Sequence, residues 1–214
     1  MTEPLGGGYQ LALHTSSSQL GLALGQGGQL IRQQTWELGR QLANRLALCL
    51  GEFLSPQSWA DLDYLVVAQG PGSFTSIRLG LVTARVLAQQ LCLPLFTYSS
   101  LQTFAQFHFS TAEEGAPLAI SQEATQGRVY GGIYQLQQGL VYPSSHSPRE
   151  DQLWELEAWQ AQLQALPPTT HCQQAPEALG YTVGALLTLA AHAWQKGDRP
   201  PWQQAVPFYH HALS

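Results

Sequence analysis

The sequence predicts an α/β protein of two lobes, each a mixed β-sheet flanked by helices, with the second lobe reduced. The first observation is composition: 44 % of the 214 residues are hydrophobic and 11 % are charged, which is typical of a globular chain with a sizeable core. The second is the order of the first half, where three strands precede alternating helices and strands. The third is a faint repeat of the opening pattern at Leu118–Tyr142.

The first lobe opens with three predicted strands, at residues 9–14, 20–24 and 29–36. The turns between them, "TSSSQ" and "GQGG", are so short that the three strands must be antiparallel neighbours.

Helices and strands then alternate. A helix is predicted over 39–54, with Leu42, Leu46, Ala47, Leu50 and Phe53 on one face. A buried strand follows at 63–69, then a helix at 75–91, a short strand "LPLFTY", and a helix "SSLQTFAQFHF" capped by Ser99 or Ser100. This order resembles the ribonuclease H-like arrangement of the actin-like (ASKHA) superfamily.

The second lobe has fewer expected elements. The similarity of residues 118–142 to the first three strands is weak, and a chance likeness of two antiparallel meanders is an open alternative. We expect one amphipathic helix over 150–163, a Pro-rich loop after it, and a closing helix over 178–196 that ends at Gly197. We therefore divide the chain into an N-terminal lobe of residues 1–104 and a smaller C-terminal lobe of residues 105–214 with an irregular tail.

Charge and cysteine usage exclude several classes of function. The net charge is −5, and Lys196 is the only lysine, so we expect no nucleic-acid binding by the chain alone. The cysteines, Cys49, Cys92 and Cys172, are far apart, which suits a reducing cytoplasm and argues against a disulfide framework or zinc site. We expect no signal peptide and no membrane span.

The segment "VVAQGPGSFTSIRLG" places Gly70, Pro71, Gly72 and Ser73 between a strand and a helix. It is not a Walker A loop, because no lysine is near, and it lacks the G-x-G-x-x-G dinucleotide pattern. Amides at a helix start could still attract an anion. The alternative, which we favour, is a tight turn with Ser73 or Thr75 capping the helix.

The helix after this turn has apolar residues on more than one stripe, which suggests burial on two sides: the sheet on one and something else on the other. Gly80 and Ala84 lie one turn apart and would allow the close approach of another backbone. That backbone could belong to a partner or to the chain's own sheet.

The sequence gives little support to catalysis. The first strand ends in His14, and a neutral imidazole does not replace a carboxylate as a ligand for Mg²⁺. The histidines have no i, i+4 pair for a metal, and the serines at 16–18 lack a G-x-S-x-G elbow. We expect no cofactor, no metal and no catalytic role for His14.

Four segments resemble the bacterial TsaB (YeaZ) family. "GPGSFTSIRLG" is similar to its G-P-G-S-F-T-G signature, "LALHTSS" to its opening strand, "QGRVYGGIY" to its second-lobe G-x-V-Y segment, and "AVPFYHHAL" to its P-x-Y-L-R segment. The likeness is close over the first ~100 residues and looser afterwards. The chain departs from the family pattern at several positions. Three are direct replacements: His14 for Asp, Ser76 for Gly, and His210-His211 for Leu-Arg. In addition, a helix that often begins with His in the family begins here near Arg40, and the acidic residue that precedes G-x-V-Y in the family appears here only as Glu123.

The resemblance implies a non-catalytic scaffold or activating subunit in the synthesis of threonylcarbamoyladenosine at position 37 of ANN-decoding tRNAs. The implied partners are a TsaD-like catalytic paralogue and, in a larger complex, a TsaE-like ATPase; tRNA would be met only through the complex. We expect an exposed apolar face on two helices to pair two copies of the chain as a homodimer when the partner is absent. Gly70–Ser73 would be a relic phosphate turn that launches an interface helix. The expected interface residues are Arg40, Leu46, Leu50, Phe74, Thr75, Arg78, Leu81, Val82 and Arg85. A small actin-like ATPase or kinase and a glycoprotease-like peptidase are the alternatives.

Overall fold

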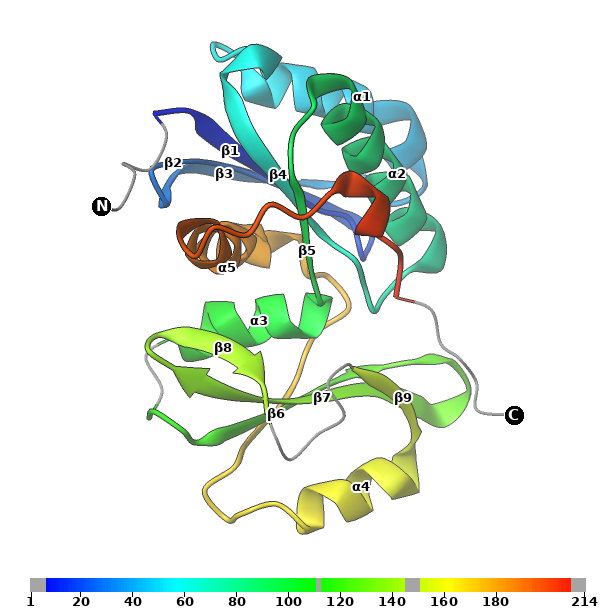
Figure 1. Cartoon of the computed structure of the whole chain (residues 1–214). Helices are drawn as coiled ribbons and strands as arrows, with labels where there is room; N and C mark the ends of the chain where they lie inside the picture. Colours follow the sequence, from blue (N-terminus) through cyan, green and yellow to red (C-terminus); the bar gives the residue numbers. More distant parts are fainter. Residues whose placement is uncertain (1–6, 111–112, 145–150, 209–214) are drawn as a thin grey trace.

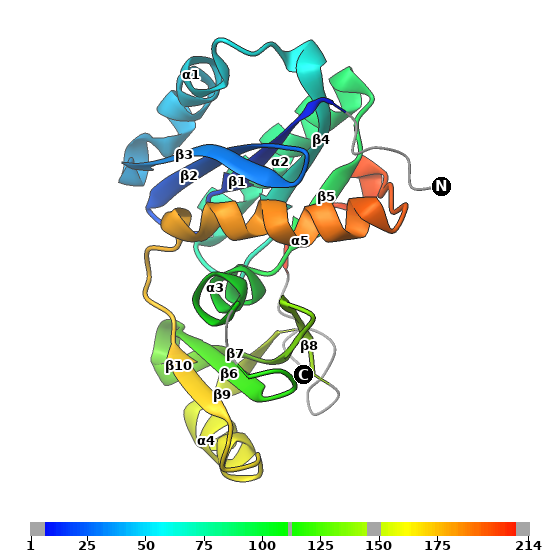
Figure 2. The same ribbon diagram turned by 90° about the vertical axis from the view of Figure 1, so that its left-hand side faces the viewer.

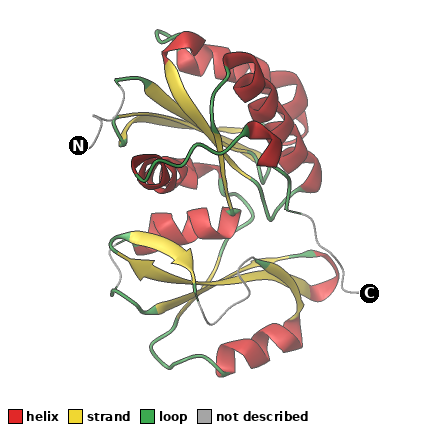
Figure 3. Cartoon of the chain, in the orientation of Figure 1, coloured by secondary structure: helices red, strands yellow, loops and turns green. Residues whose placement is uncertain are grey.

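The computed structural model describes residues 7–110, 113–144 and 151–208. It contains two five-stranded sheets, one above the other in Figure 1, with helices between and around them (Figure 3). The predicted α/β architecture with two mixed sheets is therefore confirmed.

The first sheet has the strand order β3-β2-β1-β4-β5. Strands β1 (Tyr9–His14), β2 (Gln19–Gln26) and β3 (Gln29–Glu37) form the predicted antiparallel meander. Strand β4 (Leu62–Ala68) runs parallel to β1, and β5 (Leu95–Tyr98) runs parallel to β4.

Helices cover both faces of this sheet (Figures 1 and 2). Helices α1 (Leu42–Leu54) and α2 (Phe74–Leu91) pack on the face to which Leu11 and Leu13 point. A short 3-10 turn, η1 (Gly39–Gln41), precedes α1. The predicted apolar stripe of α1 is buried except at Ala47, which is exposed.

Helix α5 (Val183–Gln195) covers the opposite face, where Leu186 and Ala190 share a core with Ala12 and Val66. It follows the turn η4 (Gly180–Thr182) and stops just before Gly197, whose φ of 92° suits a helix end. A helix from the second half of the sequence therefore completes the first lobe. The division of the chain between residues 104 and 105 stays a prediction.

The second sheet has the order β10-β6-β7-β8, with β9 also paired to β7. Its strands are β6 (Pro117–Glu123), β7 (Arg128–Gln137), β8 (Leu140–Pro143), β9 (Gln152–Glu155) and β10 (His171–Gln174). Helix α3 (Ser100–Phe109) lies between the sheets and packs Leu101 and Phe104 onto the second. Its N-cap is Ser99, whose hydroxyl accepts hydrogen bonds from the amides of Leu101 and Gln102, as predicted. Helix α4 (Leu156–Gln164) covers the far face.

Two predictions for the second lobe are wrong. The amphipathic helix begins at Leu156 and not at 150, because residues 152–155 form β9 against β7. The Pro-rich loop contains β10, which pairs in parallel with β6 through the mostly polar "HCQQ". Both strands are fixed by distant partners, so local patterns did not indicate them.

Three further short turns, η2 (Trp59–Asp61), η3 (Thr125–Gly127) and η5 (Trp202–Gln204), complete the described fold. Within that fold we find no helix with the length and apolar character that crossing a bilayer requires.

Candidate functional site

The Gly-Pro-Gly turn leads from β4 directly into α2. Gly72 has a φ of 144°, and a Cβ at this position would lie 2.1 Å from the carbonyl oxygen of Ser16. A side chain is thus excluded both by backbone conformation and by space. The glycine lets the turn sit directly on the loop between β1 and β2.

Two polar backbone groups of this turn are bonded within the chain. The Ser73 amide donates to the carbonyl of Ser16 at 2.7 Å, and the carbonyl of Gly70 accepts from the Ser100 amide at 2.7 Å. The expected side-chain cap of α2 is not found: Ser73 makes no capping bond, and its hydroxyl donates to the Ser76 hydroxyl at 3.1 Å. One amide at the helix start, that of Ser73, is therefore already bonded within the chain.

A cleft of about 510 Å³ opens beside the turn, between the two lobes. Its first-lobe wall carries the hydroxyls of Ser16, Ser17 and Ser73. Its second-lobe wall comprises Gln122, Glu123, Ala124, Thr125, Tyr130, Gln174, Ala175, Pro176 and Glu177. Both charged residues in this lining are glutamates, so the cleft offers no cation to a phosphate.

His14 lies at the end of β1 with no exposed surface. Burial lowers the pKa of its imidazole to about 3, so the ring is neutral at pH 7. Its Nδ1 is 3.4 Å from the Ser16 hydroxyl, and its Nε2 has no hydrogen-bond partner among the described residues. The ring is thus a buried neutral group.

No group of three or more histidine, cysteine or acidic side chains in the described segments is placed to hold a metal ion. His146, His210 and His211 lie outside those segments.

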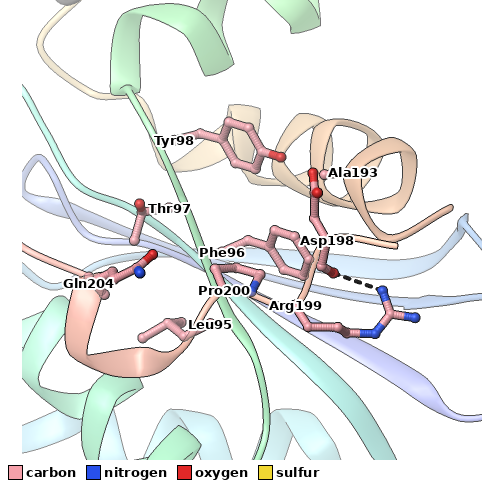
Figure 4. A pocket seen from close by; sticks show the side chains of 10 residues that line it. Leu95, Phe96, Thr97, Tyr98, Ala193, Asp198, Arg199, Pro200 and Gln204 are labelled. Carbon is pink, nitrogen blue, oxygen red and sulfur yellow. Dashed lines mark hydrogen bonds between the residues drawn. The ribbon is translucent and has the colours of Figure 1, made fainter. Parts of the chain in front are cut away.

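A second pocket, of about 470 Å³, lies along the outer edge of β5 (Figure 4). Segment 198–205 runs past this edge, and the Leu95 amide donates to the Pro200 carbonyl at 3.1 Å. Arg199 donates to the carbonyls of Asp198 and Trp194, and its guanidinium lies 3.2 Å from the centroid of the Trp194 ring. The tail is thereby fastened over the open edge of the sheet.

Helix α2 presents an apolar stripe to solvent. Phe74, Val82 and Val86 are 53 %, 56 % and 51 % exposed, and Arg78 lies between them at the same four-residue spacing. The Arg78 guanidinium stacks 3.9 Å from the centroid of the Phe74 ring. Val86 is missing from the expected interface, although counting in fours from Phe74 would have found it.

The remaining expected interface residues divide into two groups. Arg40 and Thr75 are exposed, and Arg85 is half-buried with its guanidinium 5.5 Å from the centroid of the Trp202 ring. Three of the expected residues are buried in the chain's own core and are not accessible to a partner: Leu46, Leu50 and Leu81. On α1 the large apolar residue that is exposed is Leu48.

The small residues of α2 also face inward. Ala84 is fully buried, and a Cβ on Gly80 would lie 2.0 Å from the Thr15 hydroxyl oxygen. The idea that these two residues admit a partner's backbone is therefore wrong: Gly80 lies against Thr15, at the end of the first strand, and Ala84 packs in the chain's own core.

These features place the chain in a class of two-lobed α/β proteins. Its members have a polar cleft between the lobes, a glycine turn that is hydrogen-bonded to the chain's own backbone, and an exposed apolar stripe on the helix after the turn. Residues 38–143 match the family model described as "TsaD: tRNA N6-adenosine threonylcarbamoyltransferase". The tRNA threonylcarbamoyladenosine biosynthesis protein TsaB of Bacillus subtilis is 34 % identical over 191 residues, covering 85 % of this chain and 81 % of that protein. The chain belongs to the TsaB family.

Two other comparisons agree with this assignment. The Escherichia coli TsaB protein is 30 % identical over 136 residues, covering 62 % of this chain and 57 % of that protein. The solved structure of YeaZ from Pseudomonas aeruginosa shares the fold, with a TM-score of 0.75 and 24 % identity over 94 % of this chain and 99 % of that chain. The resemblance seen in the sequence motifs is confirmed.

Proposed function

We propose that this chain is a non-catalytic subunit of the machinery that makes tRNA threonylcarbamoyladenosine, and that it acts by binding a TsaD-like catalytic subunit. The curated relatives carry the name of that biosynthesis. A TsaE-like ATPase would join the larger complex, and tRNA would be reached only through it.

The observation that carries the proposal is the exposed stripe Phe74–Arg78–Val82–Val86 of α2. Large apolar side chains repeated at four-residue spacing on a solvent-facing stripe are typical of a surface that a partner covers. Helix α1 packs on the same face of the sheet and adds Leu48 and, through η1, Arg40. A partner of standard interface size covers roughly 800 Å² on each side, an area that two helices can supply.

The proposed docking surface differs from the expected one in its apolar members. It keeps the solvent-accessible residues and replaces the three buried leucines by Leu48 and Val86. Its members are Arg40, Leu48, Phe74, Thr75, Arg78, Val82, Arg85 and Val86. In the absence of a partner, the same surface would pair two copies of this chain.

A phosphoryl-transfer enzyme is less well supported. Such an enzyme stabilises phosphate charge with Lys, Arg or a bound metal, whereas the cleft is lined by Glu123 and Glu177. Tight binding of Mg-ATP by the isolated chain would favour this alternative, and calorimetry can measure it.

One contact bears on a hydrolase alternative: the Ser16 hydroxyl lies near His14 and Ser16 also lines the cleft. The low pKa of His14 makes its imidazole a weak base, because the buried imidazolium would be costly to form. The pair therefore lacks the activation that a serine nucleophile needs.

The proposal is tested by measuring affinity for the TsaD-like subunit with purified variants. Val82→Glu should weaken association by about tenfold or more, because it puts a charge into an apolar contact. Leu156→Glu replaces an apolar residue of α4 that is 45 % exposed, and it should leave affinity unchanged. Equal affinity of both variants and the wild type, with equal melting temperatures, would show that α2 is not the docking helix.

A further inference from the structure

We propose that a small apolar pocket beside the first turn of α2 receives one large apolar side chain, an aromatic ring, from the TsaD-like partner. This inference rests on the proposed function, because it names the contact that would anchor the partner at one end of the docking surface.

The pocket lies where three parts of the chain meet: the glycine turn with α2, the second lobe, and the tail. Its walls are mainly apolar and aromatic side chains, and they include Pro71, Phe74, Ile77, Tyr130, Pro207 and Phe208. None of these six side chains carries a formal charge at neutral pH, so the pocket suits an apolar group and not an ion.

The tail is held against the turn by backbone contacts. The Phe208 amide donates to the carbonyl of Gln69 at 2.9 Å. A Cβ on Gly70 would lie 3.3 Å from the Cβ of Phe208 and 2.9 Å from the Cδ1 of Ile77. The missing side chain of Gly70 therefore lets Phe208 and Ile77 approach the same turn closely, and the two residues form adjoining walls of the pocket.

Phe74 connects the pocket to the docking surface. It lines the pocket, and it is also the first member of the exposed stripe that continues through Val82 to Val86. The guanidinium of Arg78 stacks 3.9 Å from the centroid of the Phe74 ring, which restricts the positions that the ring can take. A partner that covers the stripe would therefore meet the pocket at the start of α2.

The size of the pocket selects its occupant. The volume is about 200 Å³. Small-molecule sites usually have volumes of roughly 300–1,000 Å³, so this pocket suits a single side chain better than a whole ligand. The aromatic walls favour an aromatic ring, since such rings pack well edge to face or offset. Aromatic side chains that enter pockets are also the residues that carry much of the binding energy at protein interfaces.

An occupant of this pocket would contact both lobes at once. Ile77 belongs to α2, whereas Tyr130 belongs to β7 and also lines the inter-lobe cleft. Association with the partner would thus depend on a residue of the second lobe that lies outside the docking surface. That dependence distinguishes an anchored partner from one that docks on the two helices alone.

The first test measures the affinity of purified full-length variants for the TsaD-like subunit. Tyr130→Ala should weaken association by about tenfold or more, because it removes an aromatic wall of the pocket. Tyr130→Phe keeps the ring and should stay within about twofold of wild type. Tyr142→Ala is the matched control, since Tyr142 is also half-buried and lies on β8 of the same sheet but does not line the pocket. The melting temperature of each variant is measured alongside.

The second test observes the pocket directly by NMR of isoleucine δ1 methyl groups labelled with carbon-13. The chain contains four isoleucines, at positions 31, 77, 120 and 133, so the signals are few. Addition of the partner should shift the methyl signal of Ile77, because the occupant comes into contact with that wall. The signal of Ile31, an exposed residue of β3, should stay in place.

Val82→Glu separates failure of this inference from failure of the proposed function. If Val82→Glu weakens association but Tyr130→Ala binds as well as wild type, or the Ile77 methyl does not move, the partner docks on α2 without entering the pocket and the inference is overturned. If neither Val82→Glu nor Tyr130→Ala weakens association, the docking surface itself is wrong. Equal losses for Tyr130→Ala and Tyr142→Ala would also overturn the inference, since they would reflect the stability of the second lobe and not the pocket.

Discussion

The amide nitrogen of Ser73 lies 2.7 Å from the carbonyl oxygen of Ser16, so the start of α2 is bonded to the loop between β1 and β2. Because Gly72 has no side chain, the two backbones can meet at this distance. The first hairpin and the helix that carries the proposed docking surface are thus joined by main-chain contacts at one point.

Gly80 lies against Thr15 at the same junction, and Gly80→Ala should lower the melting temperature. In an open helix this change stabilises by up to about 1 kcal/mol, but here the new Cβ would lie 2.0 Å from the Thr15 hydroxyl oxygen. Gly51→Ala is the control, since Gly51 is at an exposed position of α1 and a Cβ there would meet nothing within 4 Å. Thermal unfolding should show opposite shifts for the two variants, and a stabilising Gly80→Ala would contradict the close contact.

His14 should make stability depend on pH. Its folded pKa of about 3 lies below the ordinary 6.5, so the unfolded chain binds more protons between these values and the free energy of unfolding falls as the pH falls. From pH 6.5 to 4.5 the loss attributable to this group should be about 2–3 kcal/mol.

The measurement is denaturant unfolding of wild type and His14→Gln across that range, in which shared carboxylate effects cancel. The variant should lose less stability than the wild type on acidification. Parallel curves would mean that His14 titrates normally.

His14→Gln should leave threonylcarbamoylation by the reconstituted complex within a few-fold of wild type.

Arg32 should stabilise the end of α1. Its Nη2 donates to the carbonyls of Phe53, Leu54 and Ser55 at 2.8–3.0 Å, where the helix leaves its last acceptors unpaired. Arg32→Ala should cost about 1–3 kcal/mol and lower the melting temperature by roughly 2–12 °C. Arg45→Ala, on an exposed turn of α1, serves as the control; equal small shifts would show that the Arg32 bonds contribute little.

Asp151 should hold the second lobe together. It is buried and accepts hydrogen bonds from the hydroxyls of Ser99 and Tyr134, thereby joining the start of α3 to β7. Burial and the charge of Asp151 raise the pKa of Tyr134, which keeps its hydroxyl protonated as the donor. Asp151→Ala should destabilise by about 2–4 kcal/mol.

A double-mutant cycle with Tyr134→Phe tests whether this loss arises from the hydrogen bond. The interaction energy should be at least about 0.5 kcal/mol. If the two substitutions change the free energy of unfolding in a strictly additive way, the hydrogen bond between Tyr134 and Asp151 does not contribute to stability.

The strands of the first sheet and helices α1 and α2 could be predicted from the sequence because their signals are local, whereas no local signal indicates that α5, at residues 183–195, covers the same sheet. Short turns set the β1–β2–β3 meander, and the glycine turn marks the start of α2 within one residue. Strands β9 and β10 could not be predicted, since each forms only by pairing with a strand more than twenty residues away.

The docking surface was the harder inference because both sides of α2 are apolar. Leu81 is 1 % exposed while the adjacent Val82 is 56 % exposed, and composition does not distinguish them. Which apolar residue faces inward follows from the position of the sheet. The cleft was missed for a related reason: its walls come from separate segments of the chain, around residues 16–17, 72–73, 122–130 and 174–177.

The position of α5 has a consequence for the order in which the molecule can be completed. The face of the first sheet formed by Ala12, Ala23 and Val66 is made before its cover, residues 183–195, which follows Val66 by more than a hundred residues. During synthesis this apolar face therefore has no helix over it until α5 has left the ribosome. Closure of the first sheet has to wait for the chain of the second sheet, which lies between them in the sequence.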